Sequence, residues 1–183
     1  MNTVSIIGTS GRAGNITKEL YIKMISATII YLKSLSLNSI ILVSGGAAFS
    51  DHIAVHIYLY KDTYNLNIIG LRLDLPCKFD MSTCKFEDTD NSDWKANPEK
   101  VSNYYHDKFN NVTNDNSYDE LCKVINMEAE IHIHKEFHSR NQYVAKSDYM
   151  LAFTFGKNCP EDGGTKHTWD LCKGKKFHIS LVK

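Results

Sequence analysis

The sequence predicts an α/β fold, namely a Rossmann-like three-layer sandwich with a mainly parallel sheet of five strands. Apolar runs rich in β-branched residues alternate with segments whose apolar residues recur at helical spacing. The runs are continuously apolar, which is typical of parallel strands covered by helices on both faces. The length of 183 residues suits one well-packed domain and is short for two. We therefore expect a single domain over residues 1–183.

The order of the elements follows from these runs. Strands are expected at 3–8, 39–46, 66–75, 148–155 and 176–182, and helices at 16–36, 49–61, 117–130, 135–147 and 163–173. Residues 76–118 are rich in Asp and Asn and poor in aliphatic residues, so they form a long insertion after the third strand, with one helix after Pro98. The sequence leaves open whether this insertion is a lid, a dimer contact or a loose loop.

Composition restricts the partners of the protein. Lys plus Arg and Asp plus Glu both number 21, so the formal net charge is zero. General binders of nucleic acid or anionic membranes need a basic field, so we expect neither as a partner, while a local anion site stays open.

Cysteines and apolar runs bear on the compartment. Five cysteines without a CxxC pair predict neither a disulfide framework nor a zinc ribbon and favour a reducing compartment. The first apolar run is too short for a signal peptide, and the most apolar stretch is interrupted by Lys33 and polar residues. A cytoplasmic location is expected.

Glycine-rich turns follow three of the predicted strands: "GTSGR", "SGGAAFSD" and "GGT". Ligands of open parallel sheets bind at the carboxyl ends of the strands. Glycines let the backbone approach a ligand, and their N–H groups, with the positive end of the next helix, suit a phosphate. One such turn is weak evidence, but three at one edge predict an anionic ligand. The glycines concerned are Gly8, Gly45, Gly46, Gly163 and Gly164.

Four segments of the chain resemble the successive motifs of the SLOG superfamily. They are "VSIIGTSGR", "VSGGAAFSDHIAV", "SRNQYVAKSDYMLAF" and "GGTKHTWDLCKGKKFHISLV", and their order and spacing match along the chain apart from 76–118. That superfamily includes the LOG phosphoribohydrolases, the DNA-processing protein of transformation and nucleotide-sensing modules of defence systems. The resemblance implies a Rossmann-like fold that binds a nucleotide or a nucleotide-derived molecule, and it implies a homodimer.

In the LOG branch an Arg and an acidic residue cleave a ribose N-glycosidic bond. The resemblance therefore implies Arg140 and Asp170 as the catalytic pair, although the acid here is Asp rather than Glu and its spacing from the glycine loop differs. Two functions stay open. One is a protein that binds a nucleotide-derived ligand, and the other is a hydrolase that releases the base from a nucleoside monophosphate. DNA binding is disfavoured by the zero net charge.

Polar residues of the turns complete the predicted ligand site. Arg12 is expected to pair with a phosphate or to be an exposed loop residue. Asp51 is expected to accept from a ribose hydroxyl or from a nearby main-chain N–H. The hydroxyls of Thr165 and Thr168 are expected to bind a phosphate or to cap a helix. His167 is expected either to hydrogen-bond the ligand or titrate near neutral pH, or to be a surface residue at the start of the helix. The full predicted set is Gly8, Thr9, Ser10, Arg12, Gly45, Gly46, Asp51, Arg140, Asn141, Gly163, Gly164, Thr165, His167 and Thr168.

Three histidines suggest a metal site at first sight. His132, His134 and His138 form an H-x-H-x3-H set with acidic residues nearby. Nothing elsewhere in the sequence completes the coordination, and motifs without their structural context are usually accidental. We expect neither a metal nor another cofactor.

Overall fold

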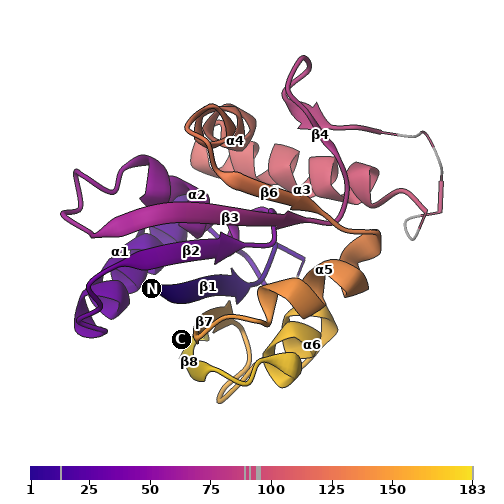
Figure 1. Ribbon diagram of the computed structural model, residues 1–183. Helices are drawn as coiled ribbons and strands as arrows, with labels where there is room; N and C mark the ends of the chain where they lie inside the picture. The colour runs from indigo at the N-terminus through magenta and orange to yellow at the C-terminus, as the bar shows by residue number, and fades with distance from the viewer. Residues whose placement is uncertain (13, 89, 91, 94–95, 183) are drawn as a thin grey trace.

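A computed structural model describes residues 1–12, 14–88, 90, 92–93 and 96–182 (Figure 1). Over these residues the chain forms a six-stranded parallel sheet in the order β6-β3-β2-β1-β7-β8 and a separate antiparallel pair, β4-β5. The strands are β1 (Asn2–Gly8), β2 (Ile40–Ser44), β3 (Ile68–Leu75), β4 (Phe79–Asp80), β5 (Lys85–Phe86), β6 (Glu130–Ile133), β7 (Tyr149–Thr154) and β8 (Lys175–Ser180).

Helices connect the strands, and several begin at side chains that cap them. They are α1 (Lys18–Ser34), α2 (His52–Leu59), α3 (Pro98–Thr113), α4 (Ser117–Asn126), α5 (Glu136–Val144) and α6 (Gly163–Leu171). The side chains of Thr17, Asn97 and Asn116 accept hydrogen bonds from main-chain N–H groups in the first turns of α1, α3 and α4. No helix among the described residues combines the length and apolarity needed to cross a membrane.

The central strands β1, β2 and β7 are buried on both faces, and this explains their continuous apolar runs. Val4 and Ile6 of β1 join the large core beneath α1 to α4, whereas Ile7 joins a smaller core with Val144 and Cys172. Helices α1 to α4 therefore cover one face, and α5 and α6 cover part of the other (Figure 1). The predicted Rossmann-like α/β sandwich is confirmed.

The sheet has six strands rather than the predicted five. The additional strand, β6, pairs with β3 at the edge of the sheet, between the segments 117–130 and 135–147 that were predicted as helices. The first of these helices ends at Asn126, and β6 begins at Glu130. Four residues of strand between two helical patterns are too short for periodicity to identify. The predicted helix after Pro98 is present as α3.

A disulfide joins Cys84, at the β4-β5 turn, to Cys122 of α4. The cysteine count predicted no disulfide framework, and for this pair that expectation was wrong. The two residues are 38 positions apart in the sequence, and the fold brings their Cα atoms within 6.3 Å of each other, a spacing that suits a disulfide.

Candidate functional site

The three glycine-rich turns meet at the carboxyl edge of the sheet, where side chains connect them. Thr165 Oγ1 of α6 donates to the carbonyl of Gly8 at 2.9 Å. Arg140 of α5 donates through Nη1 to the carbonyl of Gly45, and the neighbouring Asn141 lies 3.4 Å from the carbonyl of Gly164. Helices α5 and α6 therefore hold the ends of β1 and β2 in one constellation.

Asp51 lies at the centre of this constellation. Its carboxylate is buried, and Oδ2 is 3.5 Å from Nη1 of Arg140. Burial raises the pKa of Asp51 to about 6, although Arg140 and the main-chain N–H groups of Ala47, Gly45 and Gly8 act in the opposite direction. Amides of the first two turns thus already face an anion within the chain.

Gly45 is required by this ion pair. A Cβ atom at residue 45 would overlap the guanidinium of Arg140 and the carboxylate of Asp51. Here the missing side chain makes room for groups of the protein itself, so the first two turns are occupied from within.

The third turn is different, because its two glycines are exposed rather than packed against a charged pair of the protein. Gly163 and Gly164 are exposed, and the first turn of α6 contains no acidic residue. Gly163 has a φ of +66°, and a Cβ there would meet no described atom within 4 Å. The N-cap residue, Asp162, makes no side-chain capping bond, so the positive end of α6 is available to an anion.

Imidazoles border this open helix terminus. Nδ1 of His167 lies 3.4 Å from Nδ2 of Asn141, and the ring of His138 on α5 lies 5.0 Å from the ring of His167. In the sequence, His138 is prominent only as part of a metal-like histidine pattern. Its position three residues before Asn141, on the same helix face, is the signal that could have placed it here.

Other predicted residues have partners within the protein or lie on another turn. Asp170 is exposed and forms an ion pair with Lys166 at 2.6 Å. Thr168 is buried and donates to the carbonyl of Gly164 within α6. Arg12 is exposed on the first turn, where the hydroxyl of Thr9 accepts from a main-chain N–H at 3.2 Å, and the adjacent Ser10 is partly exposed.

The insertion helix α3 supports the first two turns. Nε2 of His106 donates to the carbonyl of Gly46 at 3.0 Å, and Nζ of Lys108 donates to the carbonyl of Gly11 at 2.6 Å. Burial, with a smaller effect of His52, lowers the pKa of His106 to about 3, so this imidazole is neutral.

The three histidines of the H-x-H-x3-H set have separate partners. His132 contacts Glu130 at 2.6 Å, and His134 contacts Asp74 at 2.8 Å, while His138 lies beside His167. In the part of the chain that the structure describes, no group of three or more His, Cys, Asp or Glu residues could hold a metal ion.

Comparison with known proteins identifies a viral relative. No model of a known protein family matches the chain. The uncharacterized protein R261 of Acanthamoeba polyphaga mimivirus is 32% identical over 188 residues, which cover 97% of this chain and 95% of that protein. The chain belongs to the same family as this mimivirus protein.

Among solved structures, a Vlm2 thioesterase domain bound with a dodecadepsipeptide aligns with a TM-score of 0.25 and 11% identity. The alignment covers 100% of this chain and 86% of that domain, and the similarity is too low to carry an argument.

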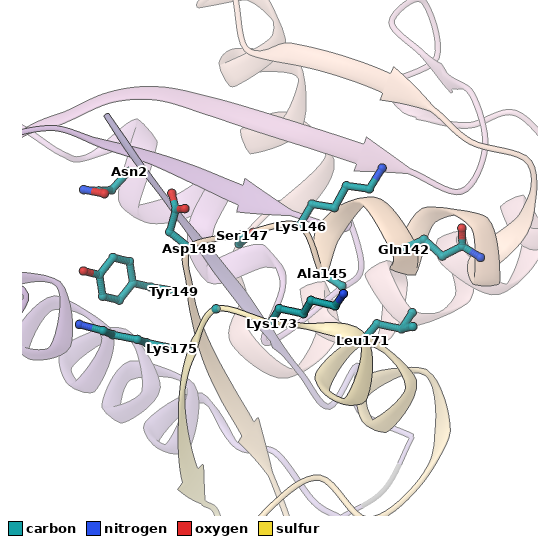
Figure 2. Close-up of a pocket in the computed structure, with 11 residues that line it drawn as sticks. Asn2, Gln142, Ala145, Lys146, Ser147, Asp148, Tyr149, Leu171, Lys173 and Lys175 are labelled. Carbon is teal, nitrogen blue, oxygen red and sulfur yellow. The ribbon is translucent and has the colours of Figure 1, made fainter.

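The protein also has a hollow of about 930 Å³ at the amino edge of the sheet, opposite the carboxyl edge (Figure 2). Lys146, Asp148 and Lys175 are among the residues that line it, near the start of β7 and β8, and the predicted ligand residues are not among them. The carboxyl edge itself contains two unlike environments, the buried Asp51–Arg140 pair and the exposed start of α6.

Proposed function

We propose that this protein binds a nucleotide or a nucleotide-derived anion of the kind that the SLOG resemblance implies, with the phosphate at the N terminus of α6. One observation carries the proposal. The buried side chain of Arg140, on a residue that is 9% exposed, has no described hydrogen-bond partner for Nε, and the next residue of α5, Asn141, contacts Gly164 at the uncapped start of α6. An unpaired buried donor is costly unless a ligand uses it.

The charges around the terminus support an anion. The amides of Gly163 and Gly164 carry the positive end of the α6 dipole, and the rings of His138 and His167 border them. The exposed carboxylate of Asp162 opposes an anion, so a ligand must use the amides and the imidazoles together.

Substitution of Gly163 tests the proposal. Asn and Asp both tolerate its left-handed backbone, and the space around it is open. Gly163→Asp places a negative charge beside the phosphate, whereas Gly163→Asn is its neutral match. By calorimetry, AMP and ribose 5-phosphate should bind more tightly than adenosine. Gly163→Asp should weaken AMP binding roughly tenfold or more, from one like charge at about 4 Å. Equal affinities for the Asp and Asn variants would refute this placement.

A second candidate function is hydrolysis of the N-glycosidic bond. It is favoured by the position of Asp51, because a carboxyl with a pKa of about 6 beside Arg140 is suited to donate a proton to a departing base near neutral pH. Asp170, which the resemblance implies as the acid, is instead paired with Lys166.

Release of free base separates the two functions. The protein is incubated with AMP and related nucleotides, and the base is followed by chromatography. Base release that Arg140→Ala and Asp51→Asn abolish, while Asp170→Asn retains it, supports hydrolysis with Asp51 as the acid. Tight binding without base release supports the binding function alone.

A further inference from the structure

Strand β6 presents an unpaired edge to solvent. It is the last strand of the sheet, beyond β3 (Figure 1), and in the described part of the chain it pairs with β3 alone. All four of its residues are exposed, with 37% of the surface of Ile131 and 57% of that of Ile133 accessible. Natural edge strands are protected by shortness, charged side chains, proline or a bulge; β6 is short and carries Glu130, but it contains no proline, lysine or bulge.

The main-chain groups available for pairing can be identified. The N–H of His134, the residue after β6, donates to the carbonyl of Leu75 in β3 at 2.8 Å. Because N–H and C=O groups alternate between the two sides of a strand, the even-numbered residues of β6 point toward β3. The N–H and C=O groups of Ile131 and Ile133 therefore point outward.

The side chains of β6 are complementary to a second copy of the same strand. The register with β3 puts Glu130 and His132 on the face covered by α5, opposite Arg72 and Asp74. Ile131 and Ile133 lie on the other face, opposite Leu73 and Leu75.

Only one self-pairing of β6 matches both faces. In an antiparallel pair centred on Ile131, each Glu130 lies opposite His132 of the second copy, and Ile131 lies opposite its own equivalent. Shifting the register by one position on each strand would bring the two copies of His132 face to face. The carboxylate–imidazole contact already observed within one chain, at 2.6 Å, shows that these two side chains reach each other readily.

We propose that two copies of this chain associate through β6 in antiparallel register centred on Ile131, which joins their sheets into one continuous sheet. Such an interface is isologous, with the same residues contributed by both copies. The contact is independent of the ligand site, which lies at the carboxyl edge of the sheet. A pair of four-residue strands buries less than the roughly 1,200 Å² of a standard interface, so the dimer is reversible and depends on concentration.

Charge reversal tests both the surface and the register. Sedimentation equilibrium from about 1 μM to about 1 mM protein is compared for four chains. Glu130→Lys removes the carboxylate that faces His132 of the second copy, and His132→Glu places two carboxylates opposite one another, so each should weaken the dimer roughly tenfold. The double variant restores opposite charges in the proposed register and should return the dissociation constant to within about threefold of the wild type.

A second variant removes the main-chain contact. Ile131→Pro removes an outward N–H and no main-chain hydrogen bond to β3, so it should abolish the dimer while circular dichroism still shows a folded chain that unfolds cooperatively. A wild-type monomer throughout the concentration range would overturn the proposal. A double variant whose dimer dissociates as readily as those of the single variants would also overturn it. So would an undiminished dimer in Glu130→Lys, His132→Glu and Ile131→Pro.

Discussion

Replacing Asp51 with Asn should stabilise the protein at neutral pH, although it removes an ion pair with Arg140. The pKa of Asp51 rises from its ordinary 3.8 to about 6 because the carboxylate is buried, and Arg140 recovers only part of that penalty. At 1.36 kcal/mol per pKa unit, holding Asp51 ionised in the folded chain costs roughly 3 kcal/mol at pH 7 relative to the unfolded chain. Asn is neutral and of similar shape, so it avoids this cost.

The sign of the pH dependence follows from the raised pKa. Between pH 3.8 and about 6 the folded chain keeps a proton on Asp51 that the unfolded chain has lost, so this contribution to stability falls as pH rises. It is fully present below pH 3.8 and is lost once the pH passes about 6. Above that pH, Asp51→Asn should exceed the wild type by about 1–3 kcal/mol, allowing for imperfect replacement of the carboxylate.

Urea unfolding at a series of pH values between about 4 and 8 measures this difference, because contributions of other titrating groups cancel between the two proteins. The difference should be small at the acid end and should grow until it levels above pH 6. An Asp51→Asn protein that is less stable than the wild type by more than about 2 kcal/mol at pH 7 would refute the reasoning. It would mean that the ion pair outweighs the burial of its carboxylate. A stabilised variant would mark Asp51 as a residue kept for function at the expense of stability.

Three further predictions concern the packing around the site. Glu120→Gln should lower the free energy of unfolding by roughly 2–3 kcal/mol, measured by urea unfolding, because the carboxylate accepts from two imidazoles of α2 and Gln offers only one oxygen. The control variant Asp119→Asn changes an exposed carboxylate and should cost under about 0.5 kcal/mol. Replacing Cys84 and Cys122 with Ser should lower the free energy of unfolding by roughly 4 kcal/mol, because the disulfide closes a loop of 38 residues. Reduction of the wild-type protein is the control and should lower this free energy by the same amount. Because the pKa of His106 falls from 6.5 to about 3, the stability that this neutral imidazole contributes is complete above pH 6.5 and is lost as the pH falls toward 3. His106→Gln should therefore weaken the dependence of the free energy of unfolding on pH over this acid range. An unchanged dependence would contradict the prediction.

Much of the fold could be predicted because its central strands are short, apolar on both faces and separated by helical patterns. The strand β6 could not be predicted, since "EIHI" alternates polar and apolar residues over a single short stretch between two helices. The pairing of Cys84 with Cys122 depends on how the insertion folds back on α4, and no local pattern encodes such a distance.

The candidate site could be located from the sequence but not described in detail. Glycines after strands mark the carboxyl edge, and Thr165 and Arg140 do connect those turns. The role of Asp51 as an anion within the chain depends on burial, which the order of residues does not reveal.

The hydrogen bonds from α3 to the first two turns restrict the motion of those turns. His106 and Lys108 donate hydrogen bonds to the carbonyls of Gly46 and Gly11, so a helix of the insertion holds the loops that follow β1 and β2. Amide hydrogens of those loops should therefore exchange with solvent only as fast as α3 detaches. Deletion of residues 76–118 would remove both hydrogen bonds, and the two loops would then move independently of the sheet.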